Sequence, residues 1–199
     1  MSKAELTKQR IIERSAEVFN QFGYAGTSMA DLMKATGLKK GGIYNHFASK
    51  DELAIAAFNY SVSVVQQKYA EALRGERLAI NRLQAVIETF CVTVAEEPVM
   101  KGGCPLMNTA IESDDTHEAL KYQAQAAMDR WRKMLTKIVR YGQKRHDIRA
   151  EVEADVVATI VISTLEGAVM MSGLYGDRTH LNRAHTHLLR YIETLRAPP

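Results

Sequence analysis

Apolar side chains recur at spacings of three and four residues along nearly the whole chain, and this helical period constrains the fold most. Between residues 6 and 22, for example, the apolar positions form one stripe along a helix. We find no segment with the period-2 alternation of a half-buried strand, and no internal repeat. The sequence therefore predicts an all-α protein with about nine helices.

Glycines and N-capping residues divide this pattern into separate helices. Gly23 is placed to end the first helix, Ser28 to cap a short second helix, and Gly37 to end that second helix. Ser49 is placed to cap a long helix whose first turn holds two carboxylates. The expected helices are residues 6–22, 29–36, 40–47, 50–73, 77–95, 106–112, 117–144, 155–172 and 178–195.

Composition excludes several protein classes. The 199 residues are 46 % hydrophobic and 25 % charged, which is ordinary globular usage. Two cysteines cannot form a disulfide framework, and no Cys/His cluster has zinc-ligand spacing, so we expect no metal and no cofactor. The N-terminus lacks the apolar core of a secretory signal, which favours the cytoplasm. No phosphate loop, nucleophile–base pair or paired carboxylates are found, so no catalytic residue is assigned, although an all-helical enzyme stays an alternative.

Positive charge is concentrated at the N-terminus. Residues 1–50 hold eight lysines and arginines against four carboxylates, whereas residues 51–199 hold eighteen against nineteen. A local basic field suits a polyanion such as DNA. A mildly basic surface without a partner is the alternative interpretation of the same charges.

Residues 27–50 have the pattern of a helix-turn-helix, two short amphipathic helices joined by a tight glycine turn. Lys39 and Lys40 stand at the N-terminus of the second helix, where the helix dipole and free N–H groups also attract phosphate. Gly41 and Gly42 remove side-chain bulk and let the backbone approach another surface closely. Because glycine lowers helix stability by about 1 kcal/mol, this pair indicates a steric requirement.

The polar residues of this segment are suited to contact duplex DNA. Lysine can bind guanine and asparagine can bind adenine in the major groove, which points to Lys40 and Asn45 as base-reading residues. Hydroxyl, imidazole and ammonium groups can bind phosphates and so fix the register. The phosphate-contacting candidates are Thr27, Ser28, Lys39, Tyr44, His46 and Lys50. The alternative is a helical hairpin whose charged face is only solvated.

Residues 7–60 resemble the N-terminal DNA-binding domain of TetR-type transcriptional regulators. The resemblance implies an all-helical fold, with a three-helix DNA-binding domain over residues 1–49 and a ligand-binding and dimerisation domain over residues 50–199. Two positions depart from the family pattern: Lys39 replaces a small capping residue, and Gly42 replaces a small residue that can touch a base. The matching features are Ile12 to Phe19, Phe22-Gly23-Tyr24, Thr27-Ser28, Thr36-Gly37-Leu38, Lys40-Gly41, Ile43-Tyr44-Asn45-His46-Phe47, Ser49-Lys50 and Leu53.

The resemblance and the residues together predict a repressor that a small-molecule effector releases from a palindromic operator. An effector must bind the DNA-competent and DNA-incompetent states with different affinity, and the long helix from Lys50 is the expected lever. Each pocket candidate is also typical of a plain core. The candidates are Phe58, Phe90, Cys104, Met107, Ile111, Met128, Trp131, Leu135 and Glu166.

Two other interpretations of the chain stay open. Cys104 lies near Lys101 and precedes a short helix, and both features lower a thiol pKa, so a thiol-based sensor of oxidants or electrophiles is one alternative. A helical adaptor that binds proteins through its first domain is the other. Steep salt dependence of binding separates a DNA-binding protein from an adaptor.

Residues 156–176 contain Glu166 as their one charged residue, over about the length of a membrane span. A mid-span glutamate and several small polar residues argue against a membrane helix. A helix that is apolar all round must be covered on every side, and a second copy of the chain is the expected cover. The interface candidates are Ile160, Leu165, Val169, Leu181, Leu188 and Leu195.

Overall fold

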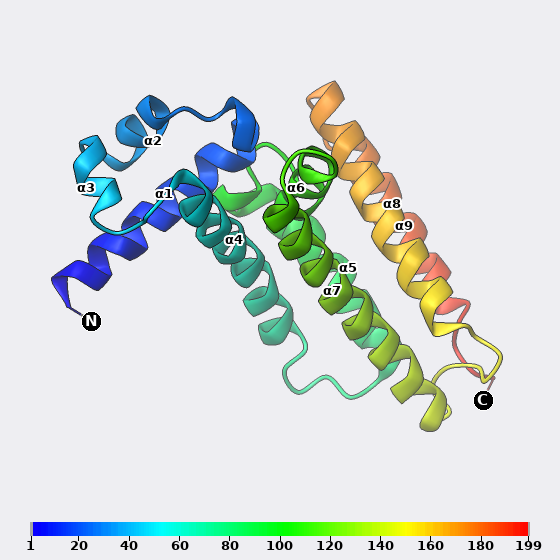
Figure 1. Ribbon diagram of the computed structural model, residues 1–199. Coiled ribbons are helices and arrows are strands. Elements are labelled where there is room, and N and C mark those ends of the chain that lie inside the picture. The colour runs from blue at the N-terminus through cyan, green and yellow to red at the C-terminus, as the bar shows by residue number, and fades with distance from the viewer. Residues whose placement is uncertain (1, 199) are drawn as a thin grey trace. The chain divides into compact units, whose positions relative to one another are not determined.

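A computed structural model describes residues 2–198, and these residues form nine α-helices, one short 3-10 helix and no strand (Figure 1). The predicted all-α class is therefore confirmed. The α-helices are α1 (Lys3–Gly26), α2 (Met29–Thr36), α3 (Lys40–Tyr44), α4 (Lys50–Ala72), α5 (Ala79–Glu96), α6 (Pro105–Ser113), α7 (Glu118–Lys144), α8 (Ala154–Tyr175) and α9 (Thr179–Glu193). The 3-10 helix, η1, spans Pro98–Met100.

Backbone contacts divide the chain into two compact units. The first comprises Met1–Val64 with Glu97–Ala126, and the second comprises Val65–Glu96 with Ala127–Pro199. Helices α4 and α7 each contribute residues to both units. The predicted functional boundary after residue 49 stays a prediction.

In the first unit, α1, α2 and α3 surround a small apolar core (Figure 1). Ser28 caps α2 reciprocally with Asp31, and Gly37 ends it in the left-handed conformation (φ 72°), as the sequence predicts. Helix α3 ends at Tyr44, three residues before the predicted end, and Phe47 still packs into the core. The core residues are Ile11, Leu32, Ile43, Phe47 and Leu53.

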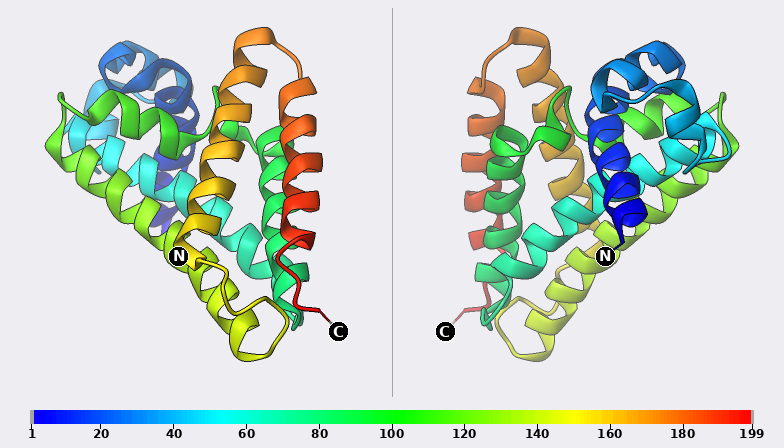
Figure 2. Two further views of the ribbon diagram at one scale, coloured as in Figure 1. Left: turned by 90° about the vertical axis from the view of Figure 1, so that its right-hand side faces the viewer. Right: turned by 90° about the vertical axis from the view of Figure 1, so that its left-hand side faces the viewer.

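In the second unit, α8 and α9 lie side by side and antiparallel, and α9 packs on α5 (Figure 2). The turn between α8 and α9 begins at Gly176, which is left-handed (φ 71°). Close packing elsewhere in this unit requires Gly142, because an added Cβ would lie 2.5 Å from the Cβ of Ala79. Apolar burial holds this unit together.

Helix α8 is the one helix within residues 2–198 that is long and apolar enough to cross a membrane. In its most apolar window, 44 % of the residues are buried inside the protein. The other face of α8 is exposed and apolar, including Val156, Met170 and Leu174. The helix therefore has one face that packs within the chain and one that does not.

Candidate nucleic-acid interface

Helix α3 presents its N-terminal end to solvent. Lys39 is its N-cap and forms no side-chain capping hydrogen bond, so the first N–H groups of α3 are not covered by that side chain. Lys39, Lys40 and Asn45 are exposed, and the exposed fraction of Tyr44 is 39 %. The Nζ of Lys40 lies 5.8 Å from the centre of the Tyr44 ring. Cationic, amide and phenol groups therefore share one exposed surface.

The fold itself does not require Gly41. A Cβ added at Gly41 would meet no atom within 4 Å, and one at Gly42 would only make ordinary contact with Leu38, at 3.5 Å. A side chain at Gly41 would point into space that the chain leaves open, and one at Gly42 would contact Leu38 without a clash. This geometry supports the interpretation that the glycines serve close approach to another molecule.

Lys50 and Tyr24 connect the start of α4 to the end of α1. The Nζ of Lys50 donates to the carbonyl of Tyr24 at 2.5 Å and lies 4.3 Å from the centre of its ring. The Tyr24 hydroxyl donates to Asp51, and this hydrogen bond, with burial, raises the pKa of Tyr24 to about 12. The His117 ring packs edge-on against Tyr24, with ring centres 4.7 Å apart. Lys50 is thus oriented by the end of α1.

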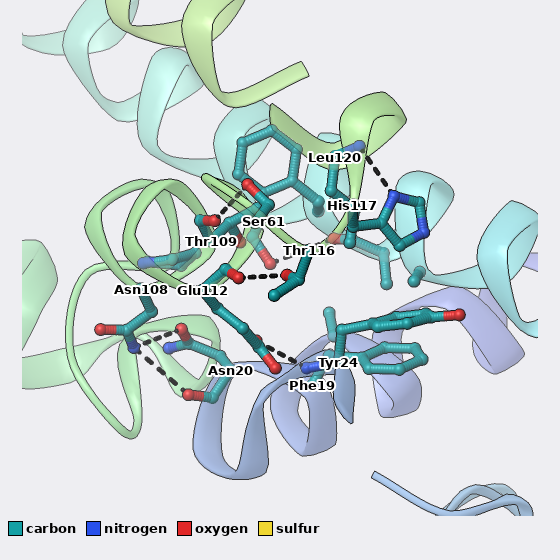
Figure 3. Close-up of a pocket in the computed structure, with 16 residues that line it drawn as sticks. Phe19, Asn20, Tyr24, Ser61, Asn108, Thr109, Glu112, Thr116, His117 and Leu120 are labelled. Atoms are coloured by element: carbon teal, nitrogen blue, oxygen red, sulfur yellow. Dashed lines mark hydrogen bonds between the residues drawn. The ribbon is translucent and has the colours of Figure 1, made fainter. Parts of the chain in front are cut away.

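A polar junction connects α1 to α6 in the first unit, around a cavity of about 40 Å³ (Figure 3). The Asn20 amide donates to the carbonyls of Val99, Lys101 and Gly103, at 2.8 to 3.1 Å. The Asn108 amide donates in turn to the Asn20 side chain, at 3.0 Å. Hydrogen bonds from two amide side chains therefore hold α1 and α6 together at this junction.

Glu112 completes this α1–α6 junction. Its carboxylate accepts a hydrogen bond from the backbone N–H group of Tyr24 at 2.8 Å (Figure 3). It accepts a second one from the backbone N–H group of Ala25, also at 2.8 Å. Gly23 lies against the same carboxylate in the left-handed region (φ 73°), where an added Cβ would come within 2.7 Å of it. Sequence reasoning missed this role, because no local pattern relates Glu112 to residues 88 positions earlier.

A second basic surface lies on α7, which the regional charge count did not reveal. Helix α7 carries seven lysines and arginines against two carboxylates. Lys133, Lys137 and Arg130 line an open groove of about 680 Å³ with Arg82. A local basic surface therefore exists outside residues 1–50, although residues 51–199 carry no net positive charge.

Comparison with known proteins decides the family. A model described as "Tetracyclin repressor-like, C-terminal domain" matches residues 79–188, and a model of "Bacterial regulatory proteins, tetR family" matches residues 11–57. The chain belongs to the TetR family. It is a transcriptional regulator with an N-terminal DNA-binding domain and a C-terminal ligand-binding domain.

Individual relatives agree with this assignment. A TetR transcriptional regulator from Chloroflexus aurantiacus is 42 % identical over the full length of both chains, with a TM-score of 0.94. A TetR-family regulator from Cytophaga hutchinsonii is 33 % identical and covers 100 % of this chain and 99 % of its own, with a TM-score of 0.89. The repressor DhaR of Mycobacterium sp. (strain GP1) is 24 % identical over 88 % of this chain and 87 % of its own length.

One DNA-contact prediction for this TetR-family regulator is wrong in the described conformation. Thr27 is 1 % exposed, and its hydroxyl donates to the carbonyl of Gly23 at 2.6 Å. A buried hydroxyl that is already engaged cannot bind a phosphate. Ser28 is exposed but caps α2. The other predicted contacts stay predictions.

The predicted effector-pocket residues fall into the two units. In the first unit, Phe58 lines the small cavity at the α1–α6 junction, and Cys104 is buried at the start of α6. Ile111 is 71 % exposed and faces solvent, which contradicts its prediction as a pocket residue. Those in the second unit are Phe90, Met128, Trp131, Leu135 and Glu166.

An aromatic stack forms the centre of the second unit. The Trp131 ring lies 5.3 Å from the Phe90 ring and 6.4 Å from the Tyr69 ring, both nearly parallel to it. Tyr69 was not among the predicted residues. The indole N–H of Trp131 is buried and donates to no atom of residues 2–198. An unsatisfied buried donor costs about 1–3 kcal/mol, which marks a place where a ligand acceptor would be stabilising.

Five of the six predicted interface residues are buried within the single chain. Leu165, Val169, Leu181, Leu188 and Leu195 pack inside the second unit, so their side chains cannot meet a partner as the prediction required. These five residues face the core of the second unit and not its outer surface. Ile160 is half-buried and borders the exposed face of α8.

Proposed function

We propose that this regulator is a repressor that binds a palindromic operator in the cytoplasm and is released by a small-molecule effector. The observation that carries the proposal is the exposed N-terminal end of α3, where Lys39, Lys40, Tyr44 and Asn45 are exposed close in sequence to two glycines that the fold does not require. The N-terminus of a recognition helix contacts base edges in the major groove. Lys40 and Asn45 read bases, and Tyr44, His46 and Lys50 hold phosphates.

The proposed repressor acts as a dimer through α8. Its exposed face repeats at spacings of three and four residues, so it forms one continuous stripe. This stripe is largely apolar, with the small residues Ser163 and Gly167 in its middle, and an exposed stripe of this kind indicates a protein interface. Two copies related by a two-fold axis would place two α3 helices in successive major grooves. The proposed interface comprises Val156, Ile160, Ser163, Gly167, Met170 and Leu174.

The proposed effector binds beside Trp131. Its buried N–H needs an acceptor, and Phe90 and Tyr69 supply apolar walls, so the effector has a planar or apolar body with a hydrogen-bond acceptor. Trp131 is the one tryptophan of the chain, and its fluorescence would therefore report binding directly. Cys104 is 5 % exposed, and its thiol is shielded from oxidants in this conformation.

Selection of duplexes from a random pool by the purified dimer tests the proposal. We expect a palindromic sequence, and we expect its affinity to fall steeply with salt because several phosphates are bound. A protein that selects no duplex at low ionic strength, or whose binding does not change with salt, would refute DNA binding and favour the adaptor alternative. Loss of selection with Val156→Glu and Leu174→Glu, but not with Tyr122→Glu on α7, would support the α8 interface.

A further inference from the structure

We infer that Glu112 is a positioning residue that couples α6 to the DNA-contacting residues by capping a helix turn from 88 positions away. The inference rests on the proposed function and adds a regulatory element to it. It begins from Gly23, whose conformation (φ 73°, ψ 171°) interrupts α1 before its last turn. The turn that follows therefore begins as a new helix N-terminus, with N–H groups that lack intrahelical partners.

The Glu112 carboxylate satisfies two of these N–H groups from another helix. One oxygen accepts from Tyr24 (Figure 3) and the other from Ala25, both at 2.8 Å. A carboxylate at a helix N-terminus is stabilised by charge-assisted hydrogen bonds and by the helix dipole. A local Ser or Asp normally performs this function, but here α6 supplies it. Movement of α6 would therefore remove the cap from this turn.

The capped turn leads directly to the proposed DNA contacts. Ser28 follows it and begins α2, and the buried Thr27 hydroxyl holds the turn to the Gly23 carbonyl. The Tyr24 carbonyl accepts from the Nζ of Lys50, and the Tyr24 hydroxyl donates to Asp51 in the first turn of α4. The position of Glu112 thus sets the positions of two phosphate-contacting candidates, Ser28 and Lys50.

The other polar groups of the junction fix where Glu112 can lie. Gly102 is pressed against α1 in the left-handed region (φ 101°), with an added Cβ 2.7 Å from the Asn20 carbonyl. Asn108 lies one helical turn before Glu112 on α6 and donates to Asn20. These contacts hold α6 in register with α1, so that the carboxylate meets the two N–H groups.

Charge-neutralising and charge-retaining variants test the inference on a duplex that the wild-type protein selects. Glu112→Gln and Asp115→Asn each remove one negative charge, and Asp115 is an exposed neighbour outside the junction. Non-specific electrostatics would make both variants bind DNA more tightly. We expect Glu112→Gln to bind about tenfold more weakly and Asp115→Asn to bind at least as tightly as wild type. Glu112→Asp keeps the charge but shortens the reach, and we expect it to weaken binding likewise, with Glu118→Asp as its control.

Salt dependence separates positioning from simple loss of stability. If Lys50 loses its phosphate, the slope of log K against log[salt] becomes shallower by roughly 0.9, because one cationic contact is lost. A variant that is only partly unfolded would keep the wild-type slope. Amide exchange at Tyr24 and Ala25 should also accelerate in Glu112→Gln while that of α8 is unchanged.

Three results have separate meanings. If the wild-type protein selects no duplex, the proposed function fails. If wild type binds and Glu112→Gln and Glu112→Asp match their controls, the inference about Glu112 is overturned while the function stands. Weaker binding with an unchanged salt slope and a lower melting temperature would also overturn it.

Discussion

The segment of residues 27–50 and helix α7 both expose cationic side chains, which are lysines in the segment and lysines and arginines on α7. The two regions differ in the backbone structure that carries these charges. In the first segment, cations surround the open N-terminus of a five-residue helix, beside an amide, a phenol and two glycines. On α7, cations line the side of a 27-residue helix, around a groove with an apolar floor. Charge attracts DNA to either surface, but bases are read by side chains on an element that enters a groove of the duplex. We therefore expect sequence-specific binding to depend on the first segment alone.

The largest expected effect is a loss of stability when a residue of the core that packs against the recognition helix α3 is truncated. Ile43 is fully buried among Ile11, Leu32 and Leu53, and Ile43→Ala should cost about 2–5 kcal/mol of unfolding free energy. The affinity of this variant for the operator should fall together with its unfolding free energy. Ile111→Ala, at an exposed position, should change stability by no more than about 0.5 kcal/mol. Denaturant titration of both variants checks the difference, and equal stability would remove Ile43 from the core that supports α3.

The next effect separates the two basic surfaces directly. Replacing Lys39 and Lys40 by alanine removes the base contact of Lys40, of roughly 1–3 kcal/mol, and the phosphate contact of Lys39, whereas replacing Lys133 and Lys137 should change operator affinity by less than about threefold. Both double variants lose the same formal charge. Fluorescence anisotropy with the selected duplex measures the affinities. An equal loss in both would mean that charge alone determines binding.

A smaller effect distinguishes base reading from phosphate contact within the first segment. Asn45→Ala should cost roughly 1–3 kcal/mol at one base pair and relax the preference there, while Tyr44→Ala should weaken all duplexes about equally. Binding to a panel of single-base variants measures both. If Asn45→Ala lowers affinity uniformly, Asn45 does not read a base.

The smallest expected effect is a change in the pKa of Tyr24, which lies just before this segment in the sequence. The pKa of Tyr24 is raised from 10.0 to about 12, chiefly by its hydrogen bond to Asp51. A raised pKa in the folded state means that the stabilising contact is complete below pH 10 and is lost as the pH rises through about 12. Ultraviolet titration should show a late tyrosine step that becomes smaller in Tyr24→Phe, while the contributions of Tyr60 and Tyr191, whose pKa burial also raises, stay unchanged. In Asp51→Asn the pKa of Tyr24 should return toward 10, and an unchanged pKa would exclude the contact.

The sequence predicted the local features of this fold well, because they depend on near neighbours. Gly23 and Gly37 interrupt the chain where expected, and α2 has its predicted bounds because Ser28 and Asp31 cap each other. Each of these residues determines the backbone conformation within a few positions of itself in the sequence. Helix α3 was predicted too long because the contact that buries Phe47 is tertiary and does not need helical backbone.

Features that depend on distant segments were not predictable in the same way. An apolar helix with two apolar faces does not reveal which face packs internally, so the buried Leu165 and the exposed Leu174 could not be distinguished. Thr27 has the side chain of a phosphate ligand, but the break at Gly23 turns it inward. Glu112 gave no local signal because its partners lie on α1.

Hydrogen exchange with and without the selected duplex tests the central claim most directly. Binding through the helix-turn-helix should protect amides in residues 27–50, most strongly at the N-terminus of α3, and should leave α7 unchanged. Protection on α7 without protection of residues 39–46, or no protection of either, would contradict the assignment of residues 27–50 as the DNA-binding surface.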